Sequence, residues 1–212
     1  MNSSLQRRRG ALTPESEEPL GGPADGDAQE LEEMLDAACA HADLDHNELY
    51  AIRRWQGMDR FYVQIQRRLL DGRHEDDGDR EEDSIIDLLD GLLDRLRLQR
   101  DVIVWRGIRN ARSIFGREST DLASLLGRTV PRGGFIATST TRVGGIAFTD
   151  PGIDPVVLRL RVRAGTGAIW VSRLGDPLLA GQRELLLGPA AMYIEAIAAG
   201  GDGILEIHVN VR

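Results

Sequence analysis

The chain has 212 residues, of which 42% are hydrophobic and 28% charged, so its composition is that of a globular protein and excludes a fully disordered one. A net charge of -8 and a pI near 5.1 argue against a nucleic-acid backbone as the main partner, because neutralising phosphates needs a basic surface. The single cysteine, Cys39, excludes an internal disulfide, and no run is long and apolar enough to span a bilayer.

The first segment contains few large apolar residues. Residues 1–27 are rich in Gly, Pro, Ser, Arg and Glu, so we expect a disordered tail that cannot offset its chain entropy by burial. The three arginines at residues 7–9 have no apolar run behind them, unlike a standard secretory signal peptide. We therefore expect a protein that acts in the cytoplasm, or one delivered into a target cell by a specialised system, with no membrane partner.

Residues 28–100 carry apolar side chains at the spacing of amphipathic helices. We expect four helices, with apolar positions within residues 31–39, 49–55, 61–70 and 85–98. Asp43 or Asp45 is a suitable cap for the second helix. Residues 73–83 are nearly all charged or glycine, which is typical of an exposed loop. We assign the aromatic side chains of this region to the core: Trp55, Phe61 and Tyr62.

After Arg100 the apolar pattern changes from the helical period to that of strands. A short helix is expected at residues 121–126, a turn at residues 131–134, and loops at 143–155 and 172–180. Helices followed by strands predict an α+β domain over residues 28–212. Its helices, which extend to residue 100, would pack on a core of two antiparallel-rich β-sheets. The expected strands are 102–105, 135–141, 156–162, 167–171, 184–187, 192–198 and 204–211.

Arg106 and Gly107 follow the first of these strands. An arginine that emerges from an apolar strand either reaches solvent or holds an anion such as a phosphate with its guanidinium. The glycine beside it permits a close approach of another backbone or a ligand. This strand end is therefore a candidate anion site.

A second strand, which begins at Phe135, ends in a cluster of hydroxyls that includes Thr138 and Ser139. Hydroxyls at a strand end either cap the following turn or hydrogen-bond a carboxylate or a ligand. A third segment opens at Gly181 with a polar turn and runs into three leucines, which indicates a strand buried on both faces. Glu184 at the start of that strand either faces solvent or is retained in a cleft for a function.

These three segments, in this order, resemble the R-S-E class of mono-ADP-ribosyltransferases. The matching motifs are Trp105-Arg106-Gly107, Gly134-Phe135-Ile136-Ala137-Thr138-Ser139 and Gln182-Arg183-Glu184. The Gln-x-Glu form of the last motif is similar to that of the Rho-modifying clostridial exoenzymes. The similarity covers residues 44–212 by pattern, and its helical part, residues 51–69, resembles the segment ahead of the family's first strand.

The resemblance implies that the chain cleaves the bond between nicotinamide and ribose in NAD and transfers ADP-ribose to a nucleophile. The transition state resembles an oxocarbenium ion, which a nearby carboxylate stabilises. Glu184 would supply this carboxylate, Arg106 would hold a phosphate or the adjacent ribose, and the backbone of Gly107 would bind the nicotinamide amide. The remaining implied site residues are Phe135, packed near the nicotinamide, and Thr138 and Ser139, which would shape the cleft and position Glu184.

Ala137 departs from the family pattern. The family has a serine there, which orients the catalytic glutamate, and an alanine cannot make that hydrogen bond. We expect Thr138, Ser139 or Thr140 to take over this role, or turnover to be slow.

Gln182 stands where family members distinguish their acceptors. A glutamate goes with arginine acceptors, whereas a glutamine goes with other nucleophiles, including the asparagine modified by Rho-directed exoenzymes and guanine in a DNA-directed branch. A carboxamide can hold an amide by paired hydrogen bonds. We therefore expect a protein side-chain amide as acceptor, recognised by the turn at residues 172–181 with Leu178 and Leu179 exposed.

Other functions remain open at this stage. The chain could be an NAD glycohydrolase, a transferase acting on a nucleic-acid base, or a catalytically impaired protein that binds NAD or a partner, and Ala137 keeps the last alternative open. The net acidity favours a protein acceptor over nucleic acid. No metal is expected, because the four histidines are scattered, and His208 is expected on the exposed face of a strand.

Overall fold

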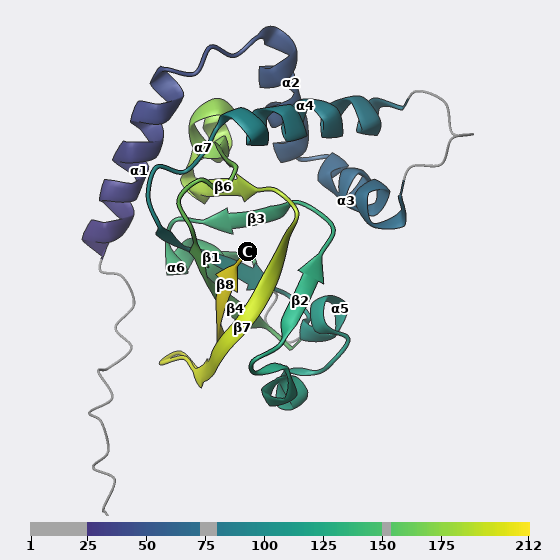
Figure 1. Ribbon diagram of the computed structural model, residues 1–212, viewed down its shortest axis with the longest axis vertical. Helices are drawn as coiled ribbons and strands as arrows, with labels where there is room; N and C mark the ends of the chain where they lie inside the picture. The colour runs from purple at the N-terminus through teal and green to yellow at the C-terminus, as the bar shows by residue number, and fades with distance from the viewer. Residues whose placement is uncertain (1–24, 73–79, 150–153) are drawn as a thin grey trace, which may run out of the picture.

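The structure, a computed structural model, describes residues 25–72, 80–149 and 154–212 (Figure 1). The α-helices are α1 (Asp25–Ala40), α2 (His46–Gln56), α3 (Phe61–Asp71), α4 (Glu81–Arg95), α5 (Ala111–Phe115), α6 (Arg142–Ala147) and α7 (Val171–Leu174). Two 3-10 helices are η2 (Ser119–Leu125) and η3 (Pro177–Gln182). The strands are β1 (Val102–Ile108), β2 (Thr129–Arg132), β3 (Ile136–Ser139), β4 (Val156–Val162), β5 (Ala168–Trp170), β6 (Glu184–Leu187), β7 (Ala190–Ala199) and β8 (Leu205–Val211).

Helix α2 begins at a capping box. The Asp45 carboxylate accepts a 2.8 Å hydrogen bond from the backbone N–H of Glu48, and the Glu48 carboxylate accepts a 3.0 Å bond from the backbone N–H of Asp45. These bonds satisfy N–H groups that have no partner within the helix, so Asp45, rather than Asp43, is the cap. The cap fixes the register of a helix whose last turn carries Trp55 and Gln56.

The strands form one mixed sheet in the order β2-β7-β8-β4-β1-β3-β6-β5, which corrects the prediction of two antiparallel-rich sheets. The two halves are continuous because β3 pairs with β6 and also meets β1 where Trp105 lies opposite Ser139. Strand β8 pairs parallel with β4, whereas the other neighbours are antiparallel. Strands β1 and β6 therefore flank β3.

Apolar residues cover both faces of this sheet. On one face, α2, α3 and α4 pack against Phe135, Ile169 and Leu186. On the other face, Ile136, Leu185 and Leu187 join a second core built largely from strand residues. All of β6 is buried, which confirms the expectation that its leucines lie in a strand covered on both sides. Figure 1 shows α2, α3 and α4 grouped at one end of the sheet.

Several segments assigned from sequence to a tail or loops are helical. Helix α1 includes residues 25–27, and the rest of the predicted tail, residues 1–24, lies outside the described residues. Helix α4 begins at Glu81, because acidic side chains in a first turn complement the helix dipole. The predicted loop 73–83 is shorter because α4 takes its last residues. Residues 73–79 and 150–153 of the predicted loops also lie outside the described parts.

Strand β2 replaces part of a turn predicted around Pro131. The strand lies at one edge of the sheet, where a proline can occupy a position that needs no N–H for the hydrogen-bond ladder. Helix α6 lies in the predicted loop 143–155, and α7 and η3 lie in the predicted turn 172–180. Across the described residues, no helix has the length and apolar character needed to cross a membrane.

Candidate functional site: a cleft between β1, β6 and helix α2

Glu184 is the first residue of β6 and lies opposite Ser139 of β3. Only 7% of its surface is exposed. Its backbone N–H donates a 2.7 Å hydrogen bond to the Ser172 hydroxyl, which ties the start of the strand to α7. Arg183, just before it, has a left-handed backbone with φ of 51°, so the chain turns sharply from η3 into β6. This turn presents the Glu184 carboxylate to a cleft instead of to bulk solvent.

Trp55 of α2 holds the Glu184 carboxylate directly. The indole Nε1–H donates a 2.9 Å hydrogen bond to Glu184 Oε1. Burial raises the pKa of Glu184 above its ordinary value, while the Trp55 bond and the positive charge of Arg106 pull that pKa down. The carboxylate is therefore kept in a desolvated position with limited compensation, which is typical of a group retained for chemistry.

Arg106 lies within β1, which continues to Ile108 instead of ending at residue 105 as predicted, and its side chain is half-buried. Its Nη1 donates a 2.8 Å hydrogen bond to the Ala137 carbonyl of β3, which fixes the guanidinium beside the sheet. Burial, followed by repulsion from Arg132, lowers the pKa of Arg106 to about 10, and attraction to Glu184 opposes this shift. The group stays charged at neutral pH, so it can hold an anion in the cleft.

Gly107 is required by the packing of α6 against β1. A Cβ at this position would lie 2.1 Å from the carbonyl oxygen of Gly145 and 3.0 Å from the backbone nitrogen of Thr149. The predicted close backbone approach is therefore made by this chain's own helix. The approach brings Phe148, at the end of α6, to the wall of the cleft.

The cleft has a volume of about 510 Å³ and brings together residues far apart in sequence. Glu184, Gln182, Arg106, Gly107 and Thr138, all predicted as site residues, line it. The other lining residues come from α2 and the following turn, α3, β1, α5, β3, the C-terminal cap of α6 and η3. They are Trp55, Gln56, Gly57, Met58, Arg60, Tyr62, Trp105, Ile108, Arg109, Ser113, Ile114, Ala137, Phe148 and Leu179.

Phe135 and Ser139 are buried and contact residues that line the cleft. Phe135 is fully buried and packs edge-on against Trp55, with ring centroids 5.6 Å apart. Ser139 is also buried, and its hydroxyl donates a 3.2 Å bond to the carbonyl of Gln182. Neither residue is among those that line the cleft. The role of Ser139 in shaping the turn stays a prediction, as does contact of Phe135 with nicotinamide.

The turn before Glu184 is built differently from its prediction. Leu178 is 92% exposed, as expected, but Leu179 is half-buried and lines the cleft. Gln56 ties this turn to α2, because its Oε1 accepts a 2.8 Å bond from the backbone N–H of Asp176. Its Nε2 is buried and has no hydrogen-bond partner among the described residues.

Trp55 and Tyr62 line the cleft, although the sequence predicts only a core position for them. The apolar pattern assigns both to the core, and Trp55 is indeed only 3% exposed, yet it also contacts the candidate catalytic carboxylate. Tyr62 packs on Trp55 with ring centroids 6.0 Å apart and lines the cleft. An available signal is the polar indole N–H of a core tryptophan, which needs a partner when it is buried.

Comparison with known proteins decides the family. Residues 30–200 match the profile of the family described as ADP-ribosyltransferase exoenzyme. The chain belongs to this family. It is accordingly an NAD-dependent mono-ADP-ribosyltransferase of a toxin and effector family. No match was found among curated proteins.

Several solved structures share the fold of this chain. The Clostridium limosum C3 exoenzyme has a TM-score of 0.70 at 18% identity, covering 87% of this chain and 94% of its own. An ADP-ribosyltransferase from Clostridium botulinum has a TM-score of 0.69 at 17% identity, covering 86% and 94%. C3stau2 from S. aureus, solved with NAD, has a TM-score of 0.68 at 17% identity, covering 87% and 95%. At such identities the likeness is one of fold.

Proposed function

We propose that this transferase moves ADP-ribose from NAD to a side-chain amide of a protein acceptor and releases nicotinamide. The observation that carries the proposal is the placement of Glu184 and Gln182 in one cleft, two residues apart on either side of the turn that ends at Arg183. A buried carboxylate and a half-buried carboxamide that line the same cleft can serve two different parts of the reaction.

The chemistry begins with the bond between ribose C1 and the nicotinamide nitrogen. This bond breaks and its electron pair leaves with nicotinamide, which becomes neutral, while positive charge develops on the ribose. The Glu184 carboxylate stabilises that charge, and its desolvated position strengthens the interaction. The acceptor nitrogen then forms a bond to C1 and loses a proton to solvent.

Arg106 and Gly107 bind NAD. The Arg106 guanidinium, already fixed by its bond to the Ala137 carbonyl, offers its other N–H groups to a phosphate or ribose. The acceptor side is formed by Gln182, with Leu179 in the cleft and Leu178 projecting from the same turn. Exposed apolar side chains beside the polar Gln182 side chain are suited to binding a protein acceptor.

Transfer of label from NAD tests the proposal. The purified chain is incubated with NAD labelled in its ADP-ribose part and a cell lysate, beside Glu184→Ala. We expect a labelled species that is absent with the variant, destroyed by protease and resistant to nuclease. A nuclease-sensitive product would instead identify a nucleic-acid base as acceptor and refute the amide assignment.

Gln182→Ala separates the two halves of the site. If Gln182 holds only the acceptor, this variant releases nicotinamide from NAD at close to the normal rate but loses transfer to protein. Equal loss of both reactions would contradict the acceptor role.

A further inference from the structure

None of the three hydroxyls at the end of β3 donates to Glu184. The Thr138 hydroxyl donates a 2.7 Å bond to the Leu185 carbonyl, and the Ser139 hydroxyl donates a 3.2 Å bond to the Gln182 carbonyl. The Thr140 hydroxyl donates to the carboxylate of Glu32 on α1. Each hydroxyl has a single proton to donate, so each is committed elsewhere.

Ala137 occupies the next position on the same face of β3 after Ser139, whose hydroxyl is already committed. Ser139 pairs with Glu184 and Ala137 pairs with Leu186, so Ala137 and Glu184 are diagonal neighbours on one face of the sheet. Both line the cleft. A methyl group at this position leaves the carboxylate without a partner from β3.

Trp55 of α2 supplies the donor that β3 does not. Its Nε1–H is 2.9 Å from Glu184 Oε1, and an indole N–H can only donate. The ring is held by an edge-on contact with Phe135 and a tilted contact with Tyr62. Across the described parts of the chain, Trp55 is the one residue whose side chain hydrogen-bonds the Glu184 carboxylate.

We propose that Trp55 is a positioning residue that orients the Glu184 carboxylate for the reaction, in place of a donor at position 137. This proposal rests on the proposed function for the step that Glu184 serves, and it adds the residue that fixes the carboxylate. Because the donor sits on a packed ring, the carboxylate is oriented before NAD enters.

Trp170 provides a matched control. Its Nε1–H also donates to a carboxylate, that of Asp36 at 2.8 Å, and the ring is similarly buried. Trp170 does not line the cleft. The same substitution therefore removes the same kind of bond away from the reacting groups.

The test compares nicotinamide release from NAD by Trp55→Phe and Trp170→Phe with the unchanged chain, each below its thermal transition. For Trp55→Phe we expect kcat to fall by about 10- to 100-fold, with KM within about 3-fold, as for loss of one hydrogen bond to a charged group. Trp170→Phe should stay within about 3-fold. If Trp55→Phe matched Trp170→Phe, the proposal would be overturned.

The pH profile supplies a readout that a structural role would not move. Arg106 is the charged group that acts on Glu184 among the described residues, and Trp55→Phe leaves it in place. Loss of the indole donor disfavours the carboxylate, so the acidic limb of kcat should move to higher pH. Adding Ala137→Ser to Trp55→Phe should move the limb back and raise kcat, and no recovery would contradict the exchange of donors.

Two further measurements protect the test from failures of folding or of the proposed function. Replacing Trp55 by benzothienylalanine keeps a bicyclic ring and removes only the N–H, and it should reproduce the loss in kcat. The chain has only three tryptophans, so their indole ¹H–¹⁵N signals can be assigned with single variants. The Trp55 signal should titrate with Glu184 and lose this titration in Glu184→Gln.

A Trp55 indole signal that did not titrate with Glu184 would overturn the proposal whether or not the chain is active. Intact NAD with the unchanged chain would refute the proposed function alone, and the indole titration would still decide the position of the carboxylate.

Discussion

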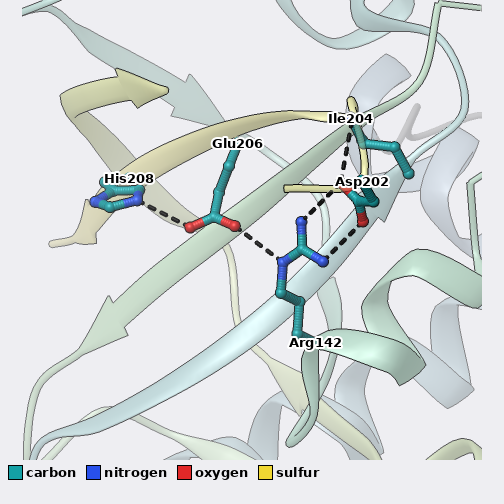
Figure 2. Close-up of polar contacts among 5 residues, drawn as sticks. All are labelled: Arg142, Asp202, Ile204, Glu206 and His208. Atoms are coloured by element: carbon teal, nitrogen blue, oxygen red, sulfur yellow. Dashed lines mark hydrogen bonds and ion pairs between the residues drawn. The ribbon is translucent and has the colours of Figure 1, made fainter. Parts of the chain in front are cut away.

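The acidic residues of the Arg142 cluster and Glu184 in the cleft lie in contrasting surroundings. In the Arg142 cluster, made of Arg142, Asp202, Glu206 and His208, every carboxylate is paired (Figure 2). Arg142 bonds Asp202 at 2.8 and 3.1 Å and Glu206 at 3.0 Å. Among the described residues, the Glu184 carboxylate in the cleft receives a hydrogen bond only from an uncharged donor, while its nearby cation, Arg106, bonds a backbone carbonyl. The difference separates charge used for structure from charge kept available for chemistry.

The pKa directions follow this contrast. Arg142 lowers the pKa of Asp202 to about 2, because the guanidinium favours the ionised carboxylate. Burial raises the pKa of Glu184 instead. His208 also belongs to the paired group, because its Nε2 lies 2.9 Å from Glu206 Oε1 and the ring is buried, which corrects the expectation of an exposed face.

Helix α6 connects the two regions. Arg142 at its start holds the turn between β7 and β8 through Asp202, and its end packs on Gly107 in the cleft. A change at either end of α6 therefore tests whether the cluster serves only stability while the cleft serves the reaction.

Gly107→Ala should have the largest effect. The added Cβ would collide with the Gly145 carbonyl at 2.1 Å, so α6 must move away from β1. We expect a loss of about 3 kcal/mol of stability, at the upper end of overpacking costs, together with loss of NAD binding. Chemical unfolding and calorimetric titration with NAD check the two effects, and an unchanged NAD affinity would break the link between α6 and the cleft.

Arg106→Ala should weaken NAD binding by about 100-fold, or about 2.7 kcal/mol, as expected when a charge-assisted contact is removed. The same substitution at Arg161, an exposed residue of β4, is the matched control and should leave the affinity unchanged. Calorimetric titration of both variants with NAD measures this. Equal affinities for the two variants would remove Arg106 from the binding site.

Arg142→Ala should reduce stability by about 1–2 kcal/mol while leaving nicotinamide release within about 3-fold. The lowered pKa of Asp202 gives stability that is present above its ordinary value of 3.8 and is lost as the pH falls toward 2. The difference between the two proteins should therefore shrink over that window in thermal unfolding experiments. A difference independent of pH would show that the ion pair is not its source.

Glu184→Gln should raise stability slightly at neutral pH, by about 1 kcal/mol, as when strain at a functional residue is relieved. The raised pKa means that the folded protein binds the proton more tightly than the unfolded chain. The carboxyl therefore costs no stability below its ordinary value of 4.5 and costs most once the pH exceeds its folded pKa. Thermal unfolding from pH 4 to pH 8 checks this, and a variant less stable at pH 8 would contradict it.

The sequence carries much of the local structure. Helical periodicity locates α2 and narrows its cap to Asp43 or Asp45, of which Asp45 is the cap, and the apolar runs locate β1 and β6. These features depend on near neighbours along the chain. A single mixed sheet could not be read in the same way, because it depends on the meeting of Trp105 with Ser139 and on a parallel pairing between β4 and β8.

The candidate site also contains features that local pattern predicts and features that depend on the fold. Arg106 and Glu184 are charged residues within or at the start of apolar strands, so local pattern singles them out. The Trp55 bond to Glu184 joins residues 129 positions apart, and no local pattern encodes it. Local pattern also misses helix α6, because two consecutive glycines disfavour a helix. They are required by packing, since a Cβ would collide with Ser139 of β3 at Gly144 and with Trp105 of β1 at Gly145.

Nicotinamide release from NAD by Glu184→Gln and Glu206→Gln, measured side by side, tests the central distinction most directly. Both substitutions remove one negative charge from a glutamate and keep its shape. We predict at least about a 1000-fold loss for Glu184→Gln, as when transition-state charge loses its stabilising partner, and a change within about 3-fold for Glu206→Gln. Retained activity in Glu184→Gln, or equal losses in the two variants, would contradict the account.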